Sequence, residues 1–402
     1  MNFKERFGTK GLEELEIPKH IKDNLSKDLR EYQTNALKYY LTNGESFKKN
    51  HLLFNMATGS GKTLIMVALM LDCFKKGYRN FVFFVNSNPI IQKTKDNFCN
   101  QISSKYLFKQ KIMIDNKIVK INEISNLQES DNSTINIYFT TIQSLHSLYK
   151  IPKENSLTFN DLKEFEFVYL ADEAHHLNAG TKGVKNKKEK ELKENWESVI
   201  TQAFQSNKEN KMFEFSATIP NDKNVQEKYE DKLIFEYNLK NFCKDGYSKR
   251  IFIEQYPNDN INLRFLGAML LSLYRELVLH KYNREYIKPV ILFKSNTISK
   301  SKENQAKFEE FVSNLKEDDI KNFYDTLNNN NLFTSEELFN KSHIFFKECF
   351  KDEYLLKLVE RIQLKFKKEV IISVNEDKKD EPWQDVLNNL EDKDNYKDNF
   401  CC

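Results

Sequence analysis

Two glycines precede a lysine and a threonine in the stretch "FNMATGSGKTLIM", residues 54–66. The chain has 10 Gly in 402 residues, yet Gly59 and Gly61 lie two apart, between an apolar run and a helical one. A glycine loop in this position points backbone N–H groups and a helix N-terminus at one spot, which binds anions. Lys62 would reach the β- and γ-phosphates of a nucleotide, and the Thr63 hydroxyl would bind Mg²⁺. A simple strand-to-helix turn is the alternative.

The loop differs from the general pattern G-x-x-x-x-G-K-[ST] at one position, because Met56 stands where the first glycine is expected. Glycine lacks the Cβ that would keep phosphate oxygens away from the backbone. The predicted cofactors are ATP and Mg²⁺. The predicted cofactor-binding residues of the loop are Thr58, Gly59, Ser60, Gly61, Lys62 and Thr63.

Two adjacent acids end another apolar run, "FVYLADEAHH", residues 167–176. Phosphoryl transfer to water needs an acidic ligand for the metal and a group that orients the water. Asp172 is predicted to hold Mg²⁺ through a water, and Glu173 to polarise the attacking water. Adjacent acids at a strand end could instead belong to the start of a helix. Their occurrence together with the glycine loop favours the catalytic reading, in which Lys62, Asp172 and Glu173 act together.

Short apolar runs with helical segments between them predict the fold class, which is α/β. Near-continuous apolar strands indicate a parallel sheet covered on both faces, and ligands of such sheets bind beyond the carboxyl ends of the strands. The runs are "HLLFNM" 51–56, "FVFFV" 81–85, "INIYFT" 135–140, "FEFVYLADE" 165–173 and "MFEFSAT" 212–218.

Charge and cysteine usage exclude some classes of protein. A net charge of +3, from 62 basic and 59 acidic residues, gives no global polycation that would indicate nucleic acid. Six cysteines show no CxxC pair, so reduced thiols are expected. No apolar run has the length of a signal peptide or a membrane span. We therefore expect a cytoplasmic protein without a membrane partner.

The stretches "MATGSGKT", "ADEAHH" and "FSATIP", in this order, resemble motifs I, II and III of superfamily 2 helicases, in the DEAH spelling. The resemblance implies a RecA-like P-loop NTPase domain. "LREYQTNA", residues 29–36, is similar to the glutamine motif, so Gln33 would read the adenine edge, with a surface glutamine as the alternative. Ser216 and Thr218 would couple the nucleotide state to domain movement, with His175 as the relay.

Two further stretches resemble the loops that contact the nucleic-acid backbone in this superfamily, "FVNSNPII" 84–91 and "TTIQSLHS" 140–147. Their hydroxyl and amide side chains suit phosphate oxygens, which position a strand without reading its sequence. Each could equally cap a loop. The residues concerned are Ser87, Asn88, Thr141 and Gln143.

Details outside these motifs resemble the Res subunit of type III restriction enzymes. They are residues 81–98, "DEAHHLNAGTK", "NWE" at 195–197 and residues 288–311. The resemblance implies a translocase that couples ATP hydrolysis to movement on double-stranded DNA. It also implies a methyltransferase subunit (Mod) that recognises the site, and a nuclease domain at the C-terminal end of the family's chains.

The resemblance predicts a helicase ATP-binding domain over residues 1–245 and an incomplete second RecA-like domain with a helical insertion over residues 246–402. Motifs V and VI, with their arginines, and the nuclease domain are expected to be missing, since the chain ends where motif V should follow. We therefore expect weak or absent ATP hydrolysis by the isolated chain unless a separately encoded C-terminal half supplies them. The alternatives are a non-catalytic nucleotide- and DNA-binding remnant and a superfamily 2 helicase that acts on RNA.

Overall fold

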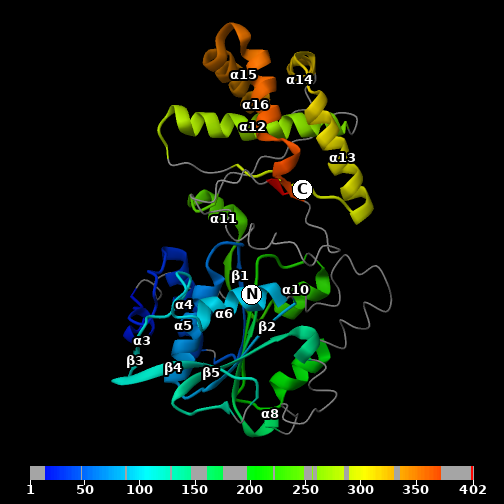
Figure 1. The fold of residues 1–402 in the computed structure, drawn as a ribbon. Coiled ribbons are helices and arrows are strands. Elements are labelled where there is room, and N and C mark those ends of the chain that lie inside the picture. Colours follow the sequence, from blue (N-terminus) through cyan, green and yellow to red (C-terminus); the bar gives the residue numbers. More distant parts are fainter. Residues whose placement is uncertain are drawn as a thin grey trace. The chain divides into compact units, whose positions relative to one another are not determined.

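The computed structural model shows two compact units, Met1–Arg250 and Ile251–Cys402, which are described separately (Figure 1). It describes residues 14–46, 48–86, 88–126, 129–145, 161–174, 197–220, 222–248, 256, 260–284, 289–329, 336–372 and 400–401. Among these residues, no helix combines the length and the apolar composition that a membrane span requires.

The first unit is built on an eight-stranded sheet with the order β3-β4-β5-β2-β6-β7-β1-β8. Every neighbouring pair is parallel except β3–β4, which is antiparallel. Residues of β2 and β6 are buried along their whole length, as expected for strands covered on both faces. The strands are β1 (His51–Met56), β2 (Asn80–Val85), β3 (Ile112–Ile114), β4 (Lys117–Glu123), β5 (Thr134–Thr141), β6 (Phe167–Ala171), β7 (Lys211–Ser216) and β8 (Leu233–Tyr237).

Helices cover both faces of this sheet (Figure 1). Successive strand residues point to opposite faces, so Phe83 joins the core beneath α4 and α5, whereas Phe84 joins a second core that includes the helix at 197–205. Leu53 packs with residues of α10 in a smaller cluster on that second face. The helices are α3 (Lys19–Lys22), α4 (Glu31–Ser46), α5 (Lys62–Lys75), α6 (Asn88–Phe98), α8 (Asp161–Glu164), α10 (Lys223–Tyr229) and α11 (Leu239–Lys244).

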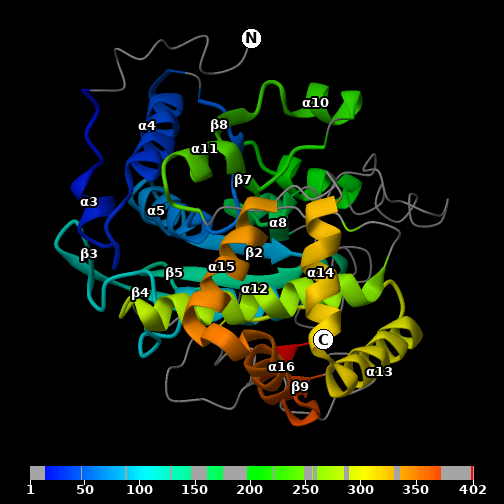
Figure 2. The ribbon, with the colours of Figure 1, turned by 90° about the horizontal axis from the view of Figure 1, so that it is seen from above.

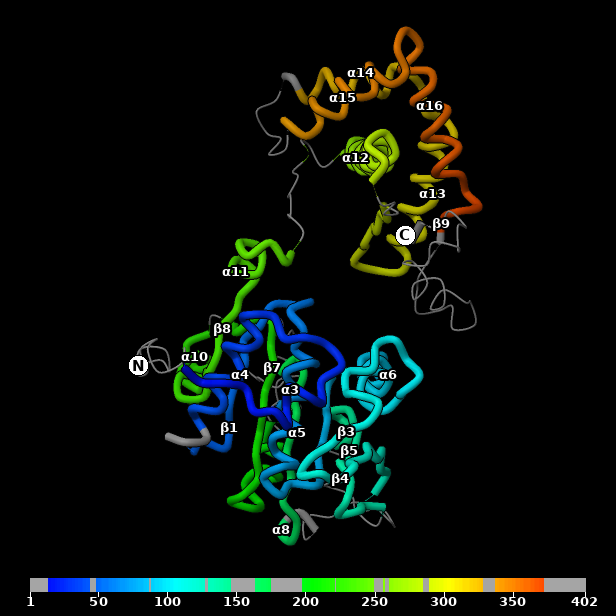
Figure 3. The backbone as a smooth tube through the Cα atoms, turned by 90° about the vertical axis from the view of Figure 1, so that its left-hand side faces the viewer, coloured from blue at the N-terminus to red at the C-terminus, as the bar shows by residue number. Residues whose placement is uncertain are grey.

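The described part of the second unit is mainly helical, around the central helix α12. Figures 2 and 3 show α14 and α15 crossing α12, and Phe265 and Leu270 of α12 lie fully buried in the core that these helices share. A two-stranded parallel pair adds to them. The incomplete second RecA-like domain stays a prediction. The elements are α12 (Ile261–Lys281), α13 (Ile298–Asn314), α14 (Glu317–Asn329), α15 (Glu336–Phe350), η4 (Lys351–Glu353), α16 (Tyr354–Lys365), η5 (Lys368–Val370), β9 (Ile371–Ile372) and β10 (Phe400–Cys401).

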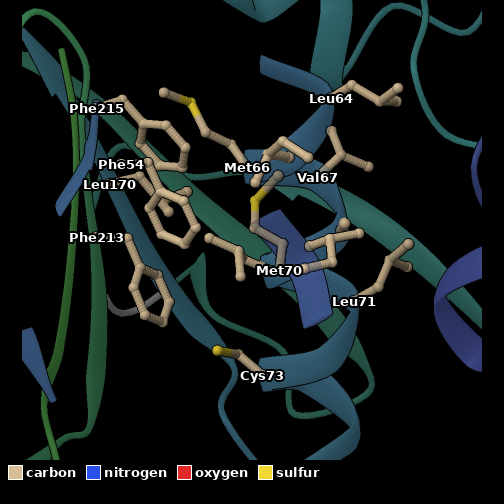
Figure 4. Packing of buried hydrophobic residues seen from close by; sticks show 14 of the residues in the cluster. Phe54, Leu64, Met66, Val67, Met70, Leu71, Cys73, Leu170, Phe213 and Phe215 are labelled. Atoms are coloured by element: carbon tan, nitrogen blue, oxygen red, sulfur yellow. The ribbon is translucent and has the colours of Figure 1, made fainter. Parts of the chain in front are cut away.

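Helix α5 is fixed to the sheet by apolar packing (Figure 4). Met66 and Met70 of α5 face the aromatic rings of β1 and β7, and both are fully buried. The rings of Phe54 and Phe215 stack with centroids 4.9 Å apart. Burial of these methionine and phenylalanine side chains stabilises the unit by on the order of several kcal/mol. It also holds the N-terminus of α5 at the carboxyl end of β1.

We expect the two units to unfold as separate cooperative transitions, each dependent on its own core. Phe215→Ala removes a fully buried ring from the first unit and Phe308→Ala one from the second. Each substitution should lower the free energy of unfolding of its own unit by about 3–5 kcal/mol. A urea titration monitored by hydrogen exchange measures the unfolding transition of each unit separately. A single transition that both substitutions shift equally would contradict two separate units.

A buried ion pair should make the first unit sensitive to acid. Burial raises the pKa of Glu214, but the hydrogen bond from His51 at 3.0 Å and the charges of His51 and Lys228 outweigh it and hold the pKa below its ordinary value. A lowered folded pKa stabilises the protein above the unfolded value, and this stabilisation is lost as the pH falls through the folded pKa.

Glu214→Gln should therefore cost about 1–3 kcal/mol at pH 7 and much less near pH 3, where the wild-type carboxyl is protonated as well. Urea midpoints of both proteins at the two pH values measure this difference. An equal cost at both values would show that the charge of Glu214 contributes nothing.

Candidate nucleotide-binding site

The parallel sheet brings the predicted catalytic stretches to one edge. Strand β1 leads into the phosphate loop, β6 into Asp172 and β7 into the turn at Ser216–Thr218. The register pairs Asn55 of β1 with Ser216, and Ala171 of β6 with Glu214 of β7. Strand β7 thus lies between the strand of the loop and the strand of the acids. The geometry is the one in which α/β sheets bind ligands.

The phosphate loop depends on its two glycines. Gly59 has φ +81° and Gly61 has φ +79°, in the left-handed region that side chains disfavour. Gly61 is the N-cap residue of α5, and its carbonyl accepts a hydrogen bond from the Leu64 amide at 3.0 Å. A Cβ on Gly61 would lie 2.4 Å from Nε2 of Gln33. Conformation and space therefore both require glycine at this position.

The first turn of α4 holds the loop from the side. Nε2 of Gln33 and the hydroxyl of Tyr32 each donate to the Ser60 carbonyl at 2.9 Å. Oε1 of Gln33 accepts from the Arg30 amide at 2.9 Å. Gln33 is buried, so the alternative of a surface glutamine is wrong. Both ends of its amide bind within the chain in this structure, and the reading of adenine stays a prediction.

Two polar side chains of the loop segment are suited to bind an anion. Lys62 is buried, and its Nζ makes only a long 3.5 Å hydrogen bond, to the Met56 carbonyl, within the described residues. The Ser60 hydroxyl is buried and has no hydrogen-bond partner in the part of the chain that the structure describes. Buried polar groups are normally satisfied. A phosphate would satisfy both, and the half-buried Thr63 and exposed Thr58 lie in the same segment.

The acids lie within electrostatic reach of this lysine. Burial raises the pKa of Asp172 above its ordinary value, and the positive charge of Lys62 opposes that rise. The Glu173 amide donates to Oδ1 of Asp172 at 3.0 Å. Glu173 itself has φ +54°, which is uncommon for a residue with a side chain. Such conformations persist where the surroundings impose them, and they concentrate at functional sites.

The predicted coupling residues form a closed turn at the end of β7. The Ser216 hydroxyl donates to the Thr218 carbonyl at 2.7 Å and accepts from the Thr218 amide at 3.4 Å. His175 lies outside the described residues, so its role as a relay stays a prediction.

The loops predicted to contact the nucleic-acid backbone are connected to each other. Nε2 of Gln143 donates to Oδ1 of Asn86 at 2.8 Å. The Thr141 hydroxyl caps its own turn, because it accepts from the Ser144 amide at 3.1 Å. Asn88 is exposed at the start of α6, and Ser87 lies outside the described residues. The contacts of these four residues with nucleic acid stay predictions.

The structure adds an aromatic cluster that the sequence did not predict. Tyr237, at the end of β8, stacks on Tyr32 with centroids 4.1 Å apart. The Arg30 guanidinium lies 4.6 Å from the ring centroid of Tyr247, and a Cβ on Gly59 would lie 3.9 Å from Phe242. Tyr237, Phe242 and Tyr247 lie near the phosphate loop and the start of α4, although about 200 positions of sequence separate them from these segments. No local pattern could have identified them.

A parallel α/β sheet with a glycine loop after its first strand and an acid pair after a nearby strand defines a RecA-like P-loop NTPase fold. The family model described as "Type III restriction enzyme, res subunit" matches residues 26–221. The "Probable type III restriction-modification enzyme HindVIP Res subunit" of Haemophilus influenzae (strain ATCC 51907 / DSM 11121 / KW20 / Rd) is 34% identical over 428 residues, covering 96% of this chain and 83% of that protein. The chain belongs to the family of Res subunits of type III restriction enzymes.

Solved structures of helicase-like proteins are more distant. The ATP-dependent Type ISP restriction-modification enzyme LlaBIII bound to DNA is 16% identical with a TM-score of 0.46, and the match covers 71% of this chain but only 22% of that one. DUF1998 helicase MrfA is 16% identical with a TM-score of 0.42 over 74% of this chain and 41% of that one. S. cerevisiae Dbp5 bound to RNA and ADP BeF3 is 14% identical with a TM-score of 0.39, and the match covers 71% of this chain and 62% of that one.

Gly61→Ala should weaken nucleotide binding by about ten-fold or more, because left-handed alanine is strained and its Cβ would meet Gln33. Gly246→Ala is the matched control: its φ is +78°, but nothing lies within 4 Å of the added Cβ. Titration with a fluorescent ATP analogue and Mg²⁺ measures both.

The double variant Gly61→Ala/Gln33→Ala removes the obstructing amide and leaves the backbone strain. It should not regain wild-type affinity, because the backbone strain remains and the predicted contact of Gln33 with adenine is lost. Equal affinities of the Gly61→Ala and Gly246→Ala proteins would contradict the close approach at the loop.

Proposed function

We propose that this Res-family chain is an ATP-dependent motor that binds ATP and Mg²⁺ at the edge of its sheet and couples hydrolysis to movement on double-stranded DNA. The observation that carries the proposal is the left-handed glycine loop at Gly59 and Gly61, which ends in the buried Lys62, whose charge acts on Asp172. Type III Res subunits work with a Mod subunit and bind DNA. The Mod subunit is accordingly the proposed partner.

The loop residues would hold the triphosphate. Backbone amides from Gly59 to Thr63 and the start of α5 would donate to phosphate oxygens. Lys62 would leave its long contact with the Met56 carbonyl and bind the terminal phosphates. The unsatisfied Ser60 hydroxyl would gain an acceptor. Each of these changes replaces a poor interaction with a charge-assisted one.

Thr63 and Asp172 would hold Mg²⁺, which when bound neutralises charge on the phosphate oxygens. Burial raises the pKa of Asp172, and the positive charge of Lys62 opposes this rise and so favours the carboxylate form that a metal ligand needs. Glu173 would orient the attacking water and accept its proton. Glu173 differs from Asp172 in its left-handed backbone, and the two neighbouring acids are proposed to serve different roles.

The base would lie against the first turn of α4. Gln33 is predicted to read the adenine edge, and the exposed ring of Tyr247 with the Arg30 guanidinium offers a planar surface beside it. Ser216 and Thr218, with His175, would transmit the nucleotide state. Ser87, Asn88, Thr141 and Gln143 would contact DNA phosphates.

The remaining parts of the proposal concern the organisation of the chain and its turnover. Residues 1–245 would form the helicase ATP-binding domain and residues 246–402 part of a second helicase domain. Weak ATP turnover by the isolated chain, and its increase by a separately encoded C-terminal half, stay predictions.

The test compares Glu173→Gln and Lys62→Ala in ATP binding and hydrolysis, with duplex DNA and the Mod subunit present. Glu173→Gln should bind ATP but hydrolyse it about 10²–10⁴-fold more slowly, because it lacks the group that accepts the proton. Lys62→Ala should lose binding as well, because a charge facing the phosphates is removed.

Lys75→Ala, in the last turn of α5, and Glu164→Gln, before β6, are the matched controls and should behave as wild type. Unchanged hydrolysis in Glu173→Gln would contradict the assigned role. Hydrolysis that single-stranded RNA stimulates, while duplex DNA does not, would instead favour the RNA helicase alternative.

A further inference from the structure

A buried amide interrupts the most important strand of the site. Strand β1 reads His-Leu-Leu-Phe-Asn-Met, and Asn55 is 6% exposed between two fully buried apolar neighbours, Phe54 and Met56. A leucine has the same number of side-chain heavy atoms and the same branching, and it would avoid the cost of burying an amide. An asparagine at this position therefore calls for an explanation beyond packing.

The amide of Asn55 bridges β1 to the turn that follows β7. The oxygen and nitrogen of an amide are assigned from the hydrogen-bond network, and the nitrogen of Asn55 faces β7. It donates to the Ser216 carbonyl at 3.1 Å and to the Ala217 carbonyl at 3.2 Å. Both carbonyls belong to the turn that the Ser216 hydroxyl closes onto Thr218.

The same strand segment carries the loop. The carbonyl of Met56, the next residue, accepts the long hydrogen bond from Lys62, and the Ala57 amide donates to the Tyr237 carbonyl at 2.9 Å. When Lys62 turns to a phosphate, the strand end loses one of these interactions. Asn55 is the side chain through which that end is joined to the turn at Ser216–Thr218.

We propose that Asn55 is a positioning residue that ties the Ser216–Thr218 turn to the strand of the phosphate loop, so that nucleotide binding at the loop changes the stability of the turn. This inference rests on the proposed function, because it needs a nucleotide at the loop. It adds a named side chain that links the two parts of the site. Asn55 acts through backbone carbonyls and contacts no nucleotide.

Hydrogen–deuterium exchange of the whole chain tests this inference without requiring turnover. The probe is the non-hydrolysable analogue adenylyl imidodiphosphate with Mg²⁺, and the readout is the exchange rate of a peptide spanning residues 215–219. In the wild-type protein the analogue should slow exchange there by about three-fold or more.

Asn55→Leu should bind the analogue within about three-fold of wild type and lose this slowing, because the two hydrogen bonds to the turn are gone. Asn55→Ala lacks the same donor without adding volume, and it replaces the leucine variant if that protein does not fold. Asn80→Leu is the matched control: Asn80 is also buried, but it starts β2 at the opposite end of the sheet. It should keep the slowing.

Each outcome decides between the inference and the proposed function. If the wild-type protein binds the analogue without slower exchange at 215–219, or if Asn55→Leu keeps the slowing, the inference is overturned while the proposed function stands. If the wild-type protein does not bind the analogue at all, the proposed function fails, and the inference fails with it. A slowing that both Asn55 variants lose and Asn80→Leu keeps supports it.

Discussion

The Ser60 carbonyl is the point on which the site depends. Two donors from α4, the Tyr32 hydroxyl and Gln33 Nε2, hold it from one side. In this arrangement Gly59 and Gly61 have left-handed conformations, and a Cβ on Gly61 would displace the Gln33 amide. These hydrogen bonds hold the loop backbone in a conformation that phosphate oxygens can approach, so binding would lose less free energy to ordering of the loop.

The second constraint is electrostatic: the site holds charged side chains in places where apolar packing alone would favour uncharged ones. Lys62 is buried and Asp172 is partly buried at this edge of the sheet, and the charge of Lys62 opposes the rise in the pKa of Asp172 that burial causes. An unsatisfied hydroxyl at Ser60 and a left-handed Glu173 lie in the same small region. Proteins tolerate such local costs where function requires them, and the apolar core between α5 and the sheet supplies the stability that offsets them.

The sequence predicted the central strands and the glycine loop between β1 and α5, and it did so for a physical reason. Strand β1 has the predicted bounds 51–56, and β2, β5, β6 and β7 overlap their predicted runs, because buried parallel strands are short apolar segments with polar residues at their ends. The apolar pattern of strands β3 and β8 is weaker than that of the central strands. Tyr237 and Tyr247 reach the loop through tertiary contacts, and the bridge made by Asn55 depends on strand register, which local patterns do not encode.

The order of the strands explains why we propose the turn after β7 as the segment that senses the nucleotide state. Strand β7 pairs with β1 on one side and with β6 on the other, so its end lies between the phosphate loop and the acid pair. Parallel strands are joined by regular hydrogen bonds along their length, but these end at the sheet edge, where the chain becomes a turn. Beyond that point isolated backbone hydrogen bonds remain, such as the one from the Ala57 amide to the Tyr237 carbonyl, and a side chain can add a further connection. Asn55 supplies this connection on the side of the loop, and the hydroxyl of Ser216 closes the turn on itself. The Ser216–Thr218 turn is therefore the described segment that follows a strand paired with both the strand of the loop and the strand of the acids.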